Sequence, residues 1–234
     1  MSEVSRRLSN RILSVLPKED YERIAPHLEY VEMKQGEVLF HSEEHIQYAY
    51  FPYRGTVSLV AVMAKGSQVE VGTVGREGMV GLPIVMGTDS VPLMAVTQIP
   101  GSGARIRAGR FKDALRQSED MYKNFLCYGQ ALFVQTAITA GCNRLHYVEG
   151  RLAKWLLTCR DRAESDELQL TQEFLAVLLG VRRAGVTTAA NKLKEDGLID
   201  YARGRIQILD AEKLEAVACE CYQAVKTEFN RLLG

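Results

Sequence analysis

The fold is decided by the stretch Thr171-Gln-Glu-Phe-Leu-Ala-Val-Leu-Leu-Gly180 and its continuation, Val181-Arg-Arg-Ala-Gly-Val-Thr-Thr-Ala-Ala-Asn-Lys-Leu-Lys-Glu-Asp196. Apolar residues recur at helical spacing in both halves, and Gly180 between them permits a sharp turn. Thr171 stands where the N-cap of the first helix is expected. The pattern therefore predicts a helix-turn-helix.

The second helix of this motif has the side chains of a DNA-reading element. Its predicted inner face is Val186, Ala189, Ala190 and Leu193, which leaves basic and hydroxyl side chains outside. Arginine pairs bidentately with guanine edges, Thr and Asn reach bases or phosphates, and lysine contacts phosphate. We expect Arg183 to contact a base. The predicted DNA-binding residues are Arg182, Arg183, Thr187, Thr188, Asn191, Lys192, Thr171 and Arg203. An ordinary helical hairpin with a solvated basic face remains the alternative, since acids and bases nearly balance over residues 147–234.

Regular structure is expected on both sides of this motif. Residues 147–162 have helical periodicity, and residues 198–209 predict two short strands, or a wing, around Ala202-Arg-Gly204. Residues 211–233 predict a single amphipathic helix. We assign residues 147–234 to one winged helix-turn-helix domain.

The N-terminal half predicts a different architecture. Short helices are expected over residues 8–28, broken at Pro17, and a two-residue period begins at Tyr30 with a hairpin turn at Gln35-Gly-Glu37. The further strand-length runs are Tyr48–Tyr53, Thr56–Met63, Gln68–Val74, Gly78–Val85, Leu93–Ile99 and Ala104–Ile106. Turn signals separate most of them, which favours an antiparallel sandwich or jelly roll over residues 1–110.

Between the two domains, residues 111–146 predict a long helix. Its spaced stripe is Leu115, Met121, Phe125, Tyr128, Leu132, Gln135, Thr139, Cys142 and His146. A second copy of the same helix is the economical partner for this stripe. Burial against the helix's own domain is the alternative.

Composition restricts the class of protein but not its function. The chain has 234 residues, with 29 basic and 29 acidic side chains. We found no unbroken apolar run long enough to span a membrane and expect a cytoplasmic protein. Five irregularly spaced cysteines indicate reduced thiols rather than a disulfide framework.

A β-roll, a long helix and a winged helix-turn-helix in this order resemble the cyclic-AMP-receptor-type (CRP/FNR) transcription regulators, an α+β fold whose roll is of the cyclic-nucleotide-binding type. The matching segments are Glu149-Gly-Arg-Leu-Ala153, Leu179-Gly-Val-Arg-Arg183, Gly197-Leu-Ile199, Gly36-Glu-Val-Leu39 and Gly55-Thr-Val57. The resemblance implies a homodimer joined along residues 115–146, which binds a palindromic DNA site and acts on RNA polymerase.

The second helix of the helix-turn-helix departs from the family's pattern at two positions. In such regulators an Arg is followed by Glu, with a second Arg one turn later. Arg183 matches the first position, whereas Ala184 and Thr188 replace the other two. We therefore expect an operator different from that of the best-known members.

The residues at the family's cyclic-nucleotide site depart further from the family's pattern. Cyclic-nucleotide binders of this kind use a Glu on the ribose and an Arg on the phosphate, where this chain has Gly81-Leu-Pro83 and Met94-Ala95. An uncompensated phosphate in an apolar pocket costs several kcal/mol, so we expect no tight cyclic-nucleotide binding. The residues assigned to the pocket are Glu77, Met79, Leu82, Met94 and Thr136. The small-molecule effector itself stays unknown. No cofactor is expected: iron–sulfur members use an N-terminal cysteine cluster, and this chain has no cysteine before Cys127.

Two other classes remain open. The pair His41 and His45 suggests a cupin-like metal enzyme on the same roll, although a solvated loop explains the pair more simply. Cys219-Glu-Cys221 could hold a metal, but on the single helix expected there, residues two apart point to different sides. We assign no catalytic residue and no metal site. The third class is a protein-binding module that uses the helix-turn-helix only for packing.

Overall fold

The computed structural model describes residues 7–64, 66–202 and 204–234. The N-terminal part forms the expected short helices, α2 (Arg11–Ser14), α3 (Lys18–Ile24) and the 3-10 turn η1 (Ala25–His27). Asn10 caps α2, and its side-chain amide donates to the carbonyls of Pro52 (2.9 Å) and Gly78 (2.8 Å). These bonds fasten the helices to the roll that follows.

The β-roll is built on two long strands. β3 (Tyr48–Val62) pairs with β5 (Leu93–Arg107), and the sheet order is β1-β5-β3-β4, with β2 also on β5. The remaining strands are β1 (Glu29–Met33), β2 (Val38–Phe40) and β4 (Gln68–Val74). The prediction of separate strands on either side of Gly55 and of Pro100 was wrong. Shifts of register near these residues, and a positive φ of 90° at Gly55, let each strand continue.

Two other local predictions in the roll were wrong. The Gln35–Glu37 turn is present, but β1 and β2 each pair with β5, so the turn does not close a hairpin between them. The run Gly78–Val85 forms an isolated bridge, Val80 to Tyr50, and the 3-10 turn η2 (Leu82–Ile84) in place of a strand. β1 and β2 find their strand partner far along the chain, whereas the residues of η2 bond locally to one another.

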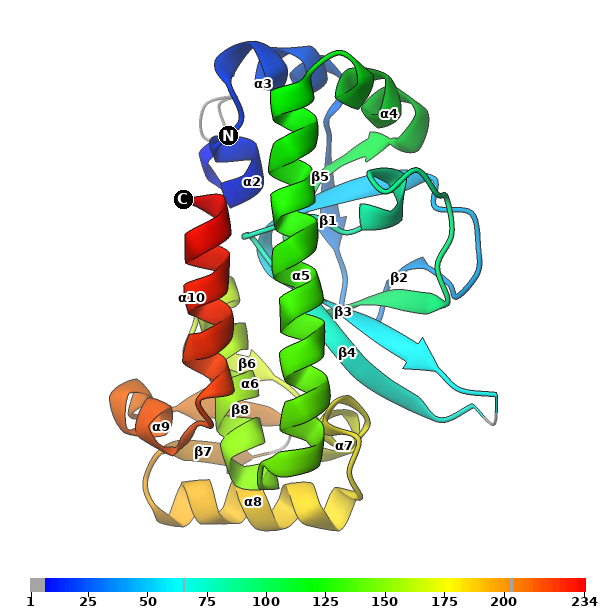
Figure 1. The fold of residues 1–234 in the computed structure, drawn as a ribbon. Coiled ribbons are helices and arrows are strands. Elements are labelled where there is room, and N and C mark those ends of the chain that lie inside the picture. Colours follow the sequence, from blue (N-terminus) through cyan, green and yellow to red (C-terminus); the bar gives the residue numbers. More distant parts are fainter. Residues whose placement is uncertain (1–6, 65, 203) are drawn as a thin grey trace.

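The helical region after the roll is divided in two. α4 (Ala108–Arg116) ends before Ser118, whose hydroxyl caps α5 (Glu119–Leu145) by accepting from Met121 N–H at 3.1 Å. Figure 1 shows α5 standing between the roll and the C-terminal helix α10 (Cys221–Leu233). Phe125 of α5 packs edge-to-face on Phe111 of α4, with ring centroids 5.0 Å apart.

The stripe of α5 predicted to meet a second copy faces the chain's own domains. Met121, Phe125, Tyr128 and Leu132 are buried in the core of the roll. For this stripe the alternative, burial within the chain, is correct. By length and composition α5 could also cross a membrane, with a mean hydropathy of 1.2 in its most apolar window, but 39% of that window is buried inside the chain. The buried residues of this helix pack in the core of the roll.

The C-terminal domain begins with α6 (Val148–Ala163). It continues with β6 (Glu167–Gln169), α7 (Gln172–Leu179), α8 (Arg183–Glu195), β7 (Ile199–Ala202) and β8 (Arg205–Ile208). β7 and β8 form the predicted wing. β6 adds a third strand to the wing in the order β6-β8-β7.

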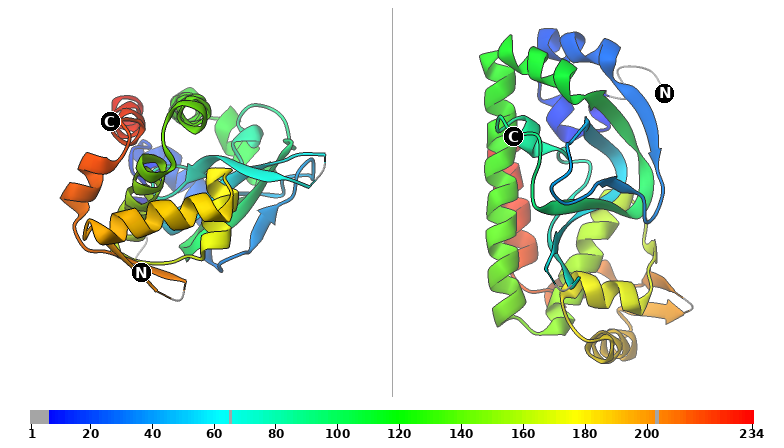
Figure 2. Two further views of the ribbon diagram at one scale, coloured as in Figure 1. Left: turned by 90° about the horizontal axis from the view of Figure 1, so that it is seen from below. Right: turned by 90° about the vertical axis from the view of Figure 1, so that its right-hand side faces the viewer.

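The prediction of one helix over residues 211–233 was wrong. α9 (Ala211–Val217) ends before Ala218, which is extended (φ −62°, ψ 144°), and α10 begins at Cys221. Cys219 N–H donates to Gly150 O of α6 at 3.3 Å. Because the chain leaves the helix to make this contact, α10 can turn and run beside α5 (Figures 1 and 2).

Candidate DNA-binding interface

The helix-turn-helix forms as predicted. The Thr171 hydroxyl accepts from Phe174 N–H at 3.2 Å and caps α7, and Gly180 takes the left-handed conformation (φ 60°) between the helices. Val186, Ala189, Ala190 and Leu193 are buried, which confirms the inner face of α8. Figure 2 shows α8 lying across the end of the molecule seen from below.

The predicted DNA-binding side chains on the outer face of α8 differ in whether they already have a partner within the chain. Arg182, Arg183, Asn191 and Lys192 are all exposed. Within the described residues, no hydrogen bond or ion pair holds the side chains of Arg182, Arg183 or Asn191. These three groups can therefore meet a ligand without breaking a contact.

The other predicted DNA-binding side chains already have partners. Thr187 is half-buried and its hydroxyl lies 2.8 Å from Gln172 Oε1, while the Thr188 hydroxyl donates to Ala184 O at 3.0 Å. Lys192 Nζ lies 2.7 Å from Glu149 Oε2 on α6, and this hydrogen bond raises the pKa of Lys192. Arg203 lies outside the described residues. Among the predicted DNA-binding residues that the structure describes, the positive charges without a partner, Arg182 and Arg183, lie at the start of α8.

The DNA-binding domain is docked on the roll. Arg162 of α6 forms a sheltered ion pair with Glu77, with Nη2 and Oε1 2.6 Å apart, and donates to Thr73 O at 3.2 Å. Trp155 Nε1–H donates to Glu70 Oε1 of β4 at 3.0 Å. α7 packs against β4 beside these contacts. Sequence reasoning missed Glu70, Trp155 and Arg162, because their pairing depends on how the two domains meet.

Comparison with known families decides the identity. Residues 150–217 match the model of the Crp-like helix-turn-helix domain, and residues 30–118 match the model of the cyclic nucleotide-binding domain. The chain belongs to the CRP/FNR family of transcription regulators. The family prediction and the α+β architecture are confirmed.

Solved structures agree with the fold of this CRP/FNR regulator. A protein of Eubacterium rectale described as a regulator of the family is 18% identical, with a TM-score of 0.67 over 90% of this chain and 98% of its own. FixK2 of Bradyrhizobium japonicum is 15% identical, with a TM-score of 0.69, over 82% of this chain and 98% of its own. The c-di-GMP-responsive regulator CLP of Xanthomonas campestris is 18% identical, with a TM-score of 0.61, over 83% and 100%. A search of curated proteins gave no significant match.

The residues assigned to an effector pocket have separate environments in this regulator. Glu77 pairs with Arg162, and the fully buried Met79 accepts the Tyr128 hydroxyl at its carbonyl (2.9 Å). Leu82 is buried in the core of the roll, Met94 is half-buried opposite Val60 in the sheet, and the Thr136 hydroxyl donates to Leu132 O. Each polar group of the set has a partner inside the chain.

Glu77 also borders a cleft of about 460 Å³ between the N-terminal helices, α6 and α10. Its charged walls are Arg11, Arg76, Glu77, Asp161, Arg162 and Lys226. The Arg162–Glu77 ion pair therefore forms part of the wall of this cleft.

The two histidines behind the enzyme alternative do not form a metal site with other side chains in the part of the chain described. His45 Nδ1 lies 3.2 Å from Asp89 Oδ2, and both side chains are more than half exposed. His41 is exposed on the same loop.

Proposed function

We propose that this regulator is a homodimer that binds a palindromic DNA site, with α8 of each protomer in the major groove. The observation that carries the proposal is the unpaired, exposed guanidinium of Arg183 at the start of α8, above an inner face that is fully packed. A bidentate contact of Arg183 with guanine would supply direct base readout. Arg182 and Lys192 would position the domain on phosphates.

The dimer would form along a second stripe of α5. Tyr122, Leu126 and Phe133 are 39%, 42% and 67% exposed and follow one another at helical spacing. Large apolar side chains so exposed on a long helix favour a partner helix. Two-fold symmetry then predicts half-sites about 34 Å apart, one helical turn.

The roll would not respond to cyclic AMP or cyclic GMP. Leu82 and Met94 supply neither a carboxylate for the ribose nor a cation for the phosphate. Calorimetry with both nucleotides checks this, and micromolar binding of either would contradict it. We further propose that the protein acts in the cytoplasm, on transcription by RNA polymerase.

The decisive experiment is selection of bound DNA from a random duplex pool, followed by binding to the selected site at several salt concentrations. A regulator should select a palindrome and lose affinity steeply as salt rises. Sedimentation of the complex should give two chains per duplex. Enrichment of no sequence would instead support a module that binds proteins and uses the helix-turn-helix for packing.

A further inference from the structure

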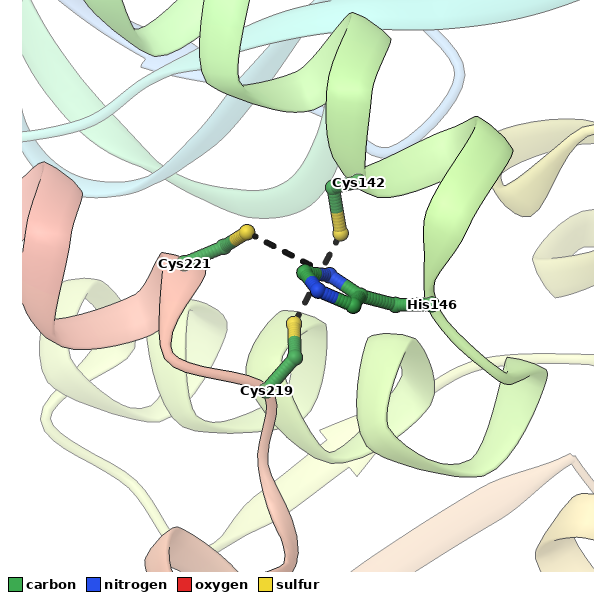
Figure 3. Close-up of side chains that lie close together, drawn as sticks. All are labelled: Cys142, His146, Cys219 and Cys221. Carbon is green, nitrogen blue, oxygen red and sulfur yellow. Dashed lines mark hydrogen bonds between the residues drawn. The ribbon is translucent and has the colours of Figure 1, made fainter.

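Four side chains outside the DNA-binding face meet where α5 ends. Cys142, His146, Cys219 and Cys221 place one ligand atom each within 4.8 Å of all the others. Figure 3 shows the three sulfurs arranged around the imidazole ring. Cys142 and His146 lie one turn apart at the end of α5, whereas Cys219 and Cys221 lie in the link between α9 and α10. The cluster therefore joins two distant parts of the sequence.

The helix break at Ala218 makes this cluster possible. On a continuous helix Cys219 and Cys221 would point to different sides. The extended backbone at Ala218 and the bond from Cys219 N–H to Gly150 O turn both sulfurs toward α5. The sequence argument against a metal at Cys219 and Cys221 assumed an unbroken helix, and that assumption was wrong.

The separations fit the edges of a small tetrahedron. Cys142 Sγ and Cys219 Sγ lie 3.6 Å apart, and Cys221 Sγ and His146 Nδ1 lie 3.5 Å apart. With Zn–S bonds of about 2.3 Å and Zn–N bonds of about 2.0–2.1 Å, tetrahedral geometry requires roughly 3.8 Å between sulfurs and roughly 3.6 Å from sulfur to nitrogen. A Cys₃His set at these spacings suits Zn²⁺.

The other nitrogen of the histidine is already oriented. His146 Nε2 lies 3.0 Å from Glu220 Oε1, and in the neutral imidazole a carboxylate at this position accepts from Nε2–H and leaves Nδ1 as the nitrogen that can bind a metal. A carboxylate behind a histidine is the usual support of a metal-ligating imidazole. Arg151 and Lys154 of α6 interact electrostatically with Cys142 and would offset the negative charge of three thiolates.

We propose that Cys142, His146, Cys219 and Cys221 bind one Zn²⁺ ion per chain. The ion would fasten the α9–α10 link to the end of α5, next to Tyr147, where the chain passes into α6 and the DNA-binding domain. Its loss would free this junction and weaken operator binding. This last consequence rests on the proposed DNA-binding function, but the zinc site itself does not.

The test uses the full chain without a histidine tag, purified with reductant, and measures metal content by mass spectrometry. We expect about one zinc per chain, and cobalt-exchanged protein should show the absorption of tetrahedral thiolate-bound Co²⁺. Cys142→Ser, Cys219→Ser and Cys221→Ser should each lose the bound zinc and alter the cobalt spectrum. Glu220→Gln should retain the site with about 10-fold weaker zinc affinity.

Cys127→Ser is the matched control, because Cys127 lies on α5 outside the cluster and should leave zinc content unchanged. Circular dichroism of each variant separates loss of a ligand from loss of the fold. Reduced wild-type protein that binds neither zinc nor cobalt would overturn the proposal. Bound iron and sulfide, or a Cys142–Cys219 disulfide in freshly isolated protein, would overturn it as well.

DNA binding is measured separately, on zinc-loaded and metal-free protein. Weaker binding by the metal-free form supports the role at the junction, and equal binding contradicts it. If neither form binds any duplex, the proposed function fails while the zinc site stands.

Discussion

Trp155 of α6 donates its indole N–H to the carboxyl group of Glu70 on β4 across 3.0 Å, linking the DNA-binding domain to the β-roll. The second carboxyl oxygen of Glu70 accepts from the Ser58 hydroxyl. Burial raises the pKa of Glu70 to about 7, although both hydrogen bonds act in the opposite direction. This carboxyl group, at the contact between the two domains, therefore titrates near neutral pH.

We expect Glu70 to make the protein less stable as pH rises. Its folded pKa of about 7 lies above the ordinary 4.5, so its contribution is fully present below about pH 4.5 and is lost as pH rises to about 7. In Glu70→Gln this loss, on the order of 3 kcal/mol, should vanish. Urea unfolding of both proteins from pH 5 to 8 measures the difference, and parallel curves would refute the assignment. Trp155→Phe, which removes one donor to the carboxylate, should shift the wild-type transition to higher pH.

Arg183→Ala should relax sequence preference in DNA binding. The loss of one bidentate contact costs about 1–3 kcal/mol at the cognate base and little on non-cognate duplexes. Lys192→Ala is the comparison, because its side chain is expected to contact phosphate. Its binding should weaken equally on every sequence, and the slope of log binding constant against log salt concentration should fall in magnitude by about one. Titrations with the selected site and with single-base variants separate the two effects. Unchanged preference in Arg183→Ala would assign base reading to another residue.

Phe133→Asp should dissociate the proposed dimer. The side chain is 67% exposed within one chain, so the monomer should keep its fold while a charge enters the apolar stripe. We expect the dissociation constant to rise by at least about 100-fold. Sedimentation equilibrium measures this change, and Leu209→Asp, at another exposed apolar side chain, should have no effect. A dimer that persists in Phe133→Asp would place the interface elsewhere.

Gly78→Ala should destabilise the roll. A Cβ at this position would overlap the buried ring of Tyr128, whose hydroxyl also donates to Met79 O. The overpacking should cost about 1–3 kcal/mol or more. Gly109→Ala, in α4 with open space around the added methyl group, should change stability by no more than about 1 kcal/mol, in the stabilising direction. Urea denaturation of both variants tests the contrast.

Local patterns were sufficient wherever the nearest partner in sequence is also the partner in space. The cap at Thr171, the turn at Gly180 and the inner face of α8 follow from residues a few positions apart, and the structure agrees with all of them. The strand breaks at Gly55 and Pro100 were misplaced for the opposite reason. Long-range pairing of β3 with β5 supplies hydrogen bonds that carry both strands past residues that usually end them.

The sequence by itself determined the order of the domains, the helix-turn-helix and the candidate reading residue Arg183, because helix periodicity, caps and turns are local properties. Only the tertiary structure decided which stripe of α5 is buried and that Trp155 donates to Glu70. It also decided that the helix after the wing breaks at Ala218. At the break Cys219 N–H donates to Gly150 O, far away in sequence, and the altered chain direction brings Cys219 and Cys221 to His146. Periodicity could not predict this cluster, because its ligands come from elements that meet only after the domains have packed.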